Sequence, residues 1–199
     1  MYINDWSFLF VVSTILLTPG PTNTLLASSG ISTGLRKSLM LLPCECLGYL
    51  AATSLWGVVF NTVAGNYSFV INLIKIASGL YIARLGRKLW LHSAFEPQDT
   101  SQPAIRGPQL FLATLLNPKA AIFAMALFPA QTWSSVNNYA RVMASFLALV
   151  AAIGVIWIGF GSALMSGRIQ WLDPRVFQRL ATLTLFGFSG WLILSGLFG

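Results

Sequence analysis

The chain has 199 residues, of which 56% are hydrophobic and only 9% charged, and its mean hydropathy is +0.72. Soluble globular domains carry about a quarter charged residues, so this composition excludes that class and indicates an integral membrane protein surrounded by lipid. The formal net charge of +7 does not indicate a nucleic-acid partner, because most Lys and Arg residues lie in short connections beside apolar stretches. That placement encodes membrane topology.

Six apolar stretches approach the roughly 20 residues needed to cross about 30 Å of hydrocarbon. They lie near 6–28, 38–60, 67–89, 108–130, 142–165 and 179–198. No Lys or Arg precedes the first stretch. A signal peptide begins with a basic region, so we expect this stretch to remain in the mature protein. The sequence predicts an all-α membrane protein with six transmembrane helices and no soluble domain.

The first stretch is interrupted by Pro19, Gly20 and Pro21, with Asn23 shortly after them. A proline inside a helix removes a backbone donor and frees a carbonyl, which finds no water in hydrocarbon. Such a break is tolerated where the backbone is buried in protein or lines a wet cavity. We therefore expect a discontinuous helix around a site, followed by a basic connection over 27–37.

Cys44 and Cys46 are the chain's only cysteines and lie two apart in the second stretch. On a helix they occupy different faces, which disfavours a disulfide between them. Together with the single His92 they form no metal-binding framework. We expect packing roles for both cysteines, and neither a metal nor a cofactor.

A polar linker over about 92–107 divides the chain into a first repeat, about 1–91, and a second repeat, about 108–199. The fourth stretch contains a second break at Asn117, Pro118 and Lys119. Each half then holds three predicted helices, and the first helix of each half is broken.

The basic residues of the connections give the orientation. Nine of them fall on one side of the predicted membrane and only Arg141 on the other. The basic side of a membrane protein is cytoplasmic, so both termini are predicted to be outside. The fourth helix then starts from the side opposite to the first, which makes the halves inverted repeats. Interrupted helices at corresponding positions of inverted halves point to a transporter's substrate site.

With these features the chain resembles the LysE/RhtB family of amino-acid exporters over nearly its whole length. The residues that carry the resemblance are Thr18-Pro19-Gly20-Pro21, then Gly30, Gly34 and Arg36, Lys75-Ile76-Ala77-Ser78-Gly79-Leu80-Tyr81, Leu85-Gly86-Arg87-Lys88, Leu116-Asn117-Pro118-Lys119-Ala120, and Phe128-Pro129. The resemblance implies a six-helix bacterial inner-membrane exporter of amino acids or close derivatives that uses the proton gradient and forms a homodimer. One departure is that Cys44 replaces the first of two glycines, four apart, that usually open the family's second span, while Gly48 is retained.

Gly154, Gly159 and Gly161 in the fifth stretch are small residues that allow neighbouring membrane helices to approach closely. We expect them to be packing positions. Together with the resemblance, they motivate the expectation of a dimer.

Three ionisable residues, Glu45, Lys75 and Lys119, lie well inside apolar stretches, where a charge costs at least about 2.5–3.5 kcal/mol. Glu45 is either a carboxylate that takes and releases a proton during transport or a salt-bridge partner of a loop Arg. Lys75 is either a counter-ion to Glu45 or a partner of the broken backbone. Lys119 meets either the substrate's carboxylate, which we favour because its span position is far from water, or the carbonyl that Pro118 frees.

Asn23 and Asn117 are predicted either to bind substrate or to satisfy carbonyls that the prolines free. The predicted substrate and ion pathway comprises Pro19, Gly20, Pro21, Asn23, Glu45, Lys75, Asn117, Pro118 and Lys119.

The same residues indicate which class of function to expect. The chain has no H-E-x-x-H, no G-x-S-x-G and no acidic cluster, so we do not expect an enzyme. We expect a secondary-active exporter with an amino acid and protons as its ligands. A passive channel, or a structural subunit of a larger membrane complex, is the alternative, because neither needs a coupling residue.

Overall fold

The computed structural model describes residues 6–63, 68–94, 105–169 and 173–198, and within these ranges the chain is helical and contains no strand. The α-helices are α1 (Trp6–Leu17), α2 (Pro21–Ser38), α3 (Leu42–Val63), α4 (Ser68–Ala94), α5 (Gly107–Leu115), α6 (Pro118–Ile122), α7 (Val136–Met165) and α8 (Pro174–Leu197). Short helical turns lie at η1 (Leu39–Leu41), η2 (Phe123–Leu127) and η3 (Ala130–Trp133). The predicted linker lies outside the described residues over 95–104.

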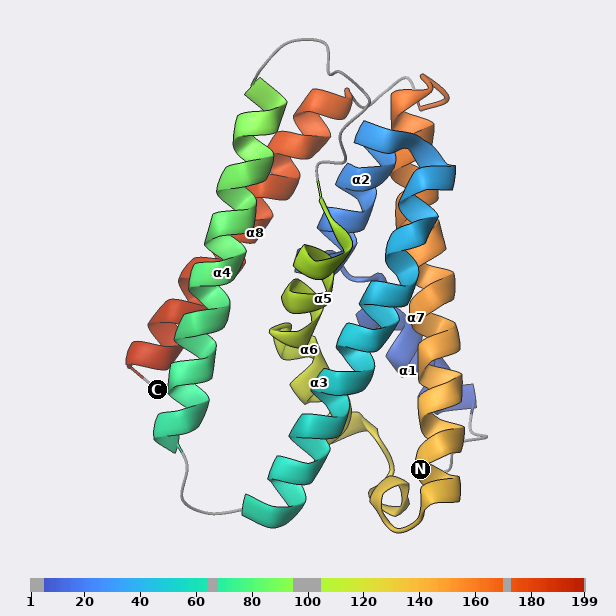
Figure 1. Cartoon of the computed structure of the whole chain (residues 1–199), viewed down its shortest axis with the longest axis vertical. Helices are drawn as coiled ribbons and strands as arrows, with labels where there is room; N and C mark the ends of the chain where they lie inside the picture. Colours follow the sequence, from blue (N-terminus) through green and yellow to red (C-terminus); the bar gives the residue numbers. More distant parts are fainter. Residues whose placement is uncertain (1–5, 64–67, 95–104, 170–172, 199) are drawn as a thin grey trace.

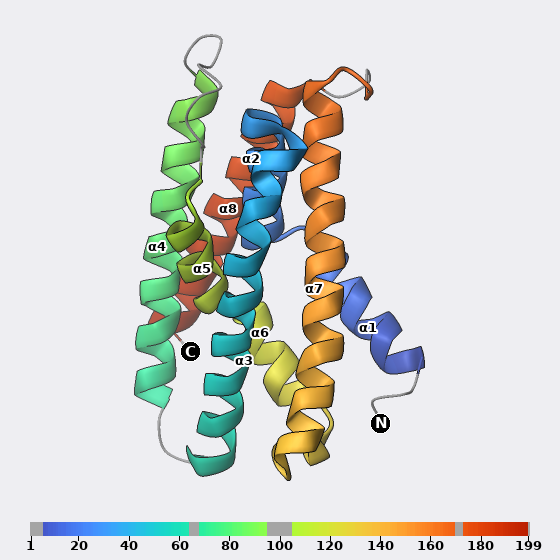
Figure 2. The same cartoon turned by 45° about the vertical axis from the view of Figure 1, so that its right-hand side comes forward.

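The helices run alternately up and down the long axis of the molecule (Figures 1 and 2). α2 rises to the upper end, α3 descends and α4 rises again. In the second half α5 and α6 descend, α7 rises and α8 descends. α1 begins and α8 ends in the lower half of Figure 1. The two interrupted segments, α1–α2 and α5–α6, therefore run in opposite directions.

Three helical stretches among the described residues are long and apolar enough to cross a membrane: Pro21–Val58, Val136–Met165 and Arg175–Leu197. The first of them contains two helices of opposite direction, α2 and most of α3. The sequence led us to expect six spans. The expected spans 6–28 and 108–130 are each divided at their prolines into shorter helices, and α4 carries four basic residues.

The connection expected over 27–37 is instead helical, because α2 continues to Ser38. Gly34 interrupts it with φ 75°, a left-handed backbone conformation that glycine adopts without a steric cost. The basic residues Arg36 and Lys37 follow this kink, in the helical turn that leads into η1.

Helices α2 and α7 pack with almost no space between their backbones. A Cβ added at Gly30 would clash with the carbonyl of Ile158, and one added at Gly161 would clash with the carbonyl of Ala27. Gly154 is also a packing position, beside Leu42 and Glu45. Gly159 is not a packing position within the described part of this chain, where no atom lies within 4 Å of a Cβ built there, which corrects our expectation of a packing contact for that residue.

Helices α4 and α8 form a second close pair, side by side in both views (Figures 1 and 2). A Cβ at Gly79 would lie 2.9 Å from the carbonyl oxygen of Ser189. The hydroxyl of Ser189 donates to the carbonyl oxygen of Gly79 at 2.9 Å. Glycine again lets two long helices approach closely.

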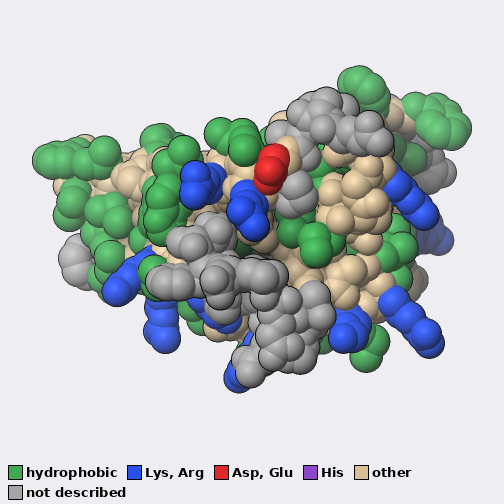
Figure 3. Space-filling model, turned by 90° about the horizontal axis from the view of Figure 1, so that it is seen from above, with side chains coloured by type: hydrophobic (Ala, Val, Ile, Leu, Met, Phe, Trp, Pro, Cys, Tyr) green, Lys and Arg blue, Asp and Glu red, His purple; other side chains and the backbone are tan. Residues whose placement is uncertain are grey.

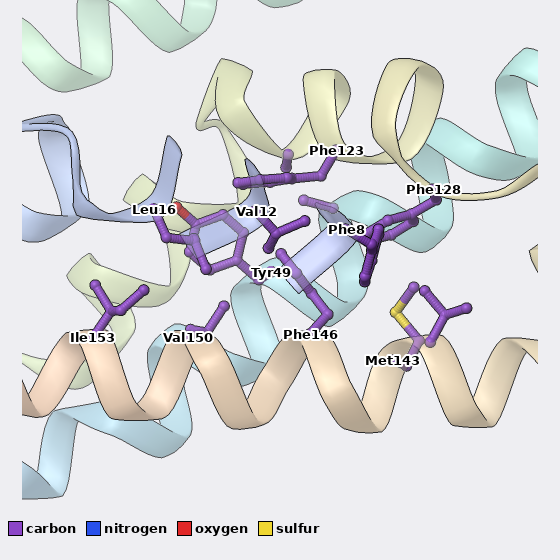
Figure 4. Close-up of a cluster of buried hydrophobic side chains, with 13 residues drawn as sticks. Phe8, Val12, Leu16, Tyr49, Phe123, Phe128, Met143, Phe146, Val150 and Ile153 are labelled. Atoms are coloured by element: carbon purple, nitrogen blue, oxygen red, sulfur yellow. The ribbon is translucent and has the colours of Figure 1, made fainter. Parts of the chain in front are cut away.

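Two clusters of buried apolar side chains fill the space between the helices. The lower cluster joins α1, α3, α6, η2 and α7, and Figure 4 shows its aromatic rings around Tyr49, among them Phe123 and Phe146. The upper cluster joins α2, η1, α4, α5, α7 and α8 and includes Leu25, Leu26 and Leu110. A layer of buried polar side chains lies between the two clusters and is described below.

Lys and Arg side chains gather at the upper end of the molecule, as Figure 3 shows from above. They come from the end of α2, the second half of α4, the start of α5, and the ends of α7 and α8 that meet there. Arg141 lies near the start of α7 at the lower end. The distribution of charge is thus strongly one-sided along the helix direction.

The contrast between Gly161 and Gly159 gives a matched test of this packing. We expect Gly161→Ala to lower the free energy of unfolding by about 1–3 kcal/mol, because its Cβ has no room against the Ala27 carbonyl. Gly159→Ala, two residues away on the same helix, should be neutral or slightly stabilising. Thermal unfolding in mild detergent measures both, and equal effects would contradict the assignment of the α2–α7 contact.

Candidate functional site

The first break separates α1 from α2 at Thr18, Pro19 and Gly20. Pro19 and Pro21 have no backbone N–H, so the hydrogen-bond ladder of α1 cannot continue into α2. Gly20 is extended, with φ −169° and ψ 176°, and Pro21 occupies the first position of α2. The Thr18 N–H still donates to the carbonyl oxygens of Thr14 at 3.2 Å and of Ile15 at 3.3 Å, but beyond it the prolines interrupt the supply of backbone donors to the end of α1.

Side chains donate to the carbonyl oxygens at the end of α1 instead. The amide nitrogen of Asn23 donates to the carbonyl oxygens of Leu16 at 2.6 Å and of Thr18 at 3.0 Å. The ammonium of Lys119 donates to the carbonyl oxygens of Ile15 at 3.0 Å and of Thr18 at 2.7 Å. One donor comes from the turn just after the break, and the other from the opposite half of the chain.

The second break separates α5 from α6 at Leu116 and Asn117. Asn117 is the N-cap of α6, and its side-chain oxygen accepts from the backbone N–H of Lys119 at 3.0 Å. Pro118 takes the first helical position, where a missing N–H costs nothing. This local geometry directs the Lys119 side chain from α6 toward the end of α1.

Asn117 also joins the second break to two other helices. Its amide nitrogen donates to the hydroxyl oxygens of Thr22 at 3.3 Å and of Tyr49 at 3.2 Å. The hydroxyls of Thr22 and Tyr49 lie 3.4 Å apart, a long hydrogen-bond distance. Thr22 begins α2 and Tyr49 is in α3, so the two breaks and α3 meet at one buried polar junction.

We call this set the junction; it consists of Thr22, Asn23, Glu45, Tyr49, Asn117 and Lys119. All six side chains are at most 7% exposed. Along each helix the junction lies between the apolar clusters. On α2, Leu25 and Leu26 lie above it. On α6 and η2, Ala120 and Phe123 lie below it. Apolar packing therefore closes the junction toward both ends of the molecule.

Glu45 is the acid of the junction and is only 2% exposed. Its Oε2 is buried and has no hydrogen-bond partner in the part of the chain that the structure describes, and it faces Gly154 of α7, where a Cβ would lie 2.8 Å from that oxygen. Glu45 interacts electrostatically with Lys119 and with the Tyr49 hydroxyl. No salt bridge to Glu45 is found among the described residues, which is not the arrangement expected if the acid served only as a partner for a loop Arg.

Lys75, which we placed in the pathway, lies elsewhere. Its ammonium donates to the side-chain oxygen of Asn72 and to the carbonyl oxygen of Ser195, each at 3.2 Å. These contacts bridge α4 and α8, away from both breaks. Neither of the two roles expected for Lys75, a counter-ion to Glu45 or a partner of broken backbone, is seen in the contacts described for it.

The structure therefore brings together eight of the nine residues of the predicted pathway and leaves out Lys75. Asn23 takes the carbonyl-satisfying role that we considered for it, whereas Asn117 caps α6 and bonds to hydroxyls. Thr22 and Tyr49 were missed. Tyr49 follows Glu45 by four residues and so shares its helix face, and Thr22 directly follows Pro21 as Lys119 follows Pro118.

Asn117→Ala tests how far the junction depends on this one side chain. We expect the free energy of unfolding to fall by about 2–3 kcal/mol, because the cap of α6 and two donated bonds are lost in a buried place. Asn138→Ala is the control, since Asn138 donates to Gln131 and Ser134 at the surface. It should change stability by no more than about 0.5 kcal/mol. Thermal unfolding in mild detergent compares them, and a similar loss in both would argue against a central role for Asn117.

Comparison with known proteins assigns a family. A model of the LysE type translocator family matches residues 13–196. A protein of Vibrio cholerae serotype O1 named "Uncharacterized membrane protein" is 24% identical over 187 residues, which cover 90% of each chain. A "Leucine efflux protein" of Enterobacter sp. is 24% identical over 187 residues, covering 84% of this chain and 83% of its own. No solved structure matches this chain. The family match and the apolar helices identify a multi-pass membrane protein, and this chain belongs to the LysE type translocator family.

Proposed function

We propose that this protein is a secondary-active exporter that moves amino acids or close derivatives out of the cytoplasm in exchange for protons. The observation that carries the proposal is the junction, where two broken helices meet a buried acid and a buried cation. The name of the Enterobacter relative supports an amino acid, leucine among them, as the solute. An amphoteric solute needs polar partners of both signs, and here the Lys119 ammonium and the carbonyl oxygens at the end of α1 supply them side by side.

The proposal includes six spans arranged as two inverted three-helix repeats. The opposite directions of α1–α2 and α5–α6 support this arrangement, as do breaks at the first helix of each half. α1 with α2, and α5 with α6 and η2, would each cross the membrane as one broken span. The charged upper end would face the cytoplasm, with both termini outside.

The closed packing around the junction favours a transporter over a passive channel. An open channel needs a continuous polar path, whereas here the lower and upper apolar clusters flank the junction. Alternate opening of one cluster and then the other would expose the junction to each side in turn. A homodimer belongs to the proposal as well, although Gly154 and Gly161 serve packing within the chain.

Counterflow in proteoliposomes tests the function. Purified protein is reconstituted with a panel of amino acids inside, and uptake of the same labelled amino acid is followed. We expect counterflow for at least one apolar amino acid, and uphill flux that collapses when an uncoupler removes the proton gradient. Flux that is only downhill and ignores the uncoupler would favour the passive channel, and no flux for any solute would favour a structural subunit.

Glu45→Gln tests proton coupling separately from solute binding. Gln has almost the same volume and shape but cannot carry a proton at this position. We expect counterflow to continue within a few-fold of the unmodified rate, while accumulation driven by a pH gradient falls at least about tenfold.

The matched control is Asp173→Asn, in an exposed acid that caps α8 by accepting from the backbone N–H of Arg175 at 2.6 Å. Asn caps helices as well as Asp does, so both activities should be retained. Full pH-driven accumulation by Glu45→Gln would assign coupling to another group.

A further inference from the structure

The last turn of α1 is a ready-made binding site for a primary ammonium group. The carbonyl oxygens of Ile15 and Thr18, here called the carbonyl cradle, lie 3.0 Å and 2.7 Å from the Lys119 ammonium. They belong to the C-terminal end of a helix, which carries partial negative charge. At Gly20 a Cβ would lie 3.1 Å from both the Cε and the Nζ of Lys119, so glycine leaves the space that the ammonium occupies.

Lys119 fills this cradle as a tethered ligand. Its ammonium is chemically the same group as the α-ammonium of an amino acid, with three donors and one positive charge. Its four-carbon stem is flexible, so the group can leave the cradle without any movement of α6. Glu45 attracts it from within the junction, and one Glu45 oxygen has no hydrogen-bond partner among the described residues.

We propose that an amino acid binds by inserting its zwitterionic head between Lys119 and the carbonyl cradle. The α-ammonium group replaces that of Lys119 on the carbonyl oxygens of Ile15 and Thr18. The α-carboxylate stays beside the displaced ammonium of Lys119. This inference rests on the proposed export function and names the chemical class that the site recognises: solutes with a free α-ammonium and a free α-carboxylate.

Charge balance favours this mode over its alternatives. A zwitterion adds no net charge to a buried site, and each of its charges receives a partner. An amine without a carboxylate would place a second cation beside Lys119 with nothing to neutralise it. A carboxylic acid without an ammonium could pair with Lys119 only if the charged donor to the cradle carbonyls were lost and not replaced, which leaves them with the neutral donors of Thr18 and Asn23 alone.

The first arm of the test uses the unmodified protein in mild detergent. Leucine, the solute in the relative's name, is compared with its two half-molecules, 3-methylbutylamine and 4-methylpentanoate. Ligand-induced shifts of the melting temperature give the affinities. We expect both half-molecules to bind at least about tenfold more weakly than leucine, the loss expected for one unmade charge-assisted contact. Binding of 4-methylpentanoate within about threefold of leucine would overturn the proposal.

The second arm removes the tethered ligand with Lys119→Ala, which empties the cradle. We expect 3-methylbutylamine to raise the melting temperature of this variant, whereas tetramethylammonium, which has no N–H, does not at the same ionic strength. The amine, which binds only weakly to the unmodified protein, should thus bind to the variant. Equal effects of the two cations would overturn the proposal.

Lys75→Ala is the control for a general response to a missing lysine, because Lys75 also donates to a helix carbonyl but is only half-buried. It should show no preference for the primary amine, and a preference as large as that of Lys119→Ala would count against the cradle. If Lys119→Ala does not fold, the first arm decides alone. If no amino acid shows counterflow, the proposed function fails, while the second arm still decides whether the cradle binds ammonium.

Discussion

The structure depends on one constraint: the carbonyl oxygens freed where α1 ends must find donors in place of the backbone N–H groups that Pro19 and Pro21 lack. A buried acceptor without a partner costs several kcal/mol in an apolar medium. At Thr18 this need is met twice, since its carbonyl oxygen accepts hydrogen bonds from both Asn23 and Lys119. Because Lys119 belongs to the other half of the chain, packing of the two halves adds a charged donor to those that Thr18 and Asn23 supply locally.

Packing around the junction follows from the same requirement. The start of α2 must stay at the end of α1, and the close contact of Gly30 and Gly161 with opposing carbonyls holds α2 firmly against α7. α7 then presents Gly154 to Glu45, so the acid is enclosed by backbone and by apolar side chains. The aromatic rings around Tyr49 close the lower side of the junction. Lys119 is the opposite charge that interacts with Glu45 there.

The two breaks and the burial of Glu45 were predictable from the sequence, because the effects of hydropathy and of proline depend on nearby residues in the chain. Breaks at Pro19 and at Pro118 follow from the missing N–H, and burial of Glu45 follows from its apolar neighbours. What could not be predicted is the partner of each polar group. One of the two donors to the Thr18 carbonyl oxygen, Lys119, is 101 residues away, and Lys75 and Lys119 look alike in sequence. Only the packing of α4 on α8 separates Lys75 from the junction. The helical turns on both sides of Gly34 were also missed, and the break between them is confined to a kink at this glycine.

The two breaks look similar in sequence but have opposite polarity. At the first, Pro19 and Pro21 remove donors on both sides of Gly20, so the break has a surplus of acceptors. At the second, Asn117 caps the new helix and Lys119 adds an ammonium, so the break has a surplus of donors. Bringing the two together cancels both surpluses and stabilises the closed molecule. It also places a site for a cation, the carbonyl cradle, directly beside a site for an anion, the Lys119 ammonium. A zwitterion carries the same two groups in the same order, and so it can replace that contact without leaving either side unpaired.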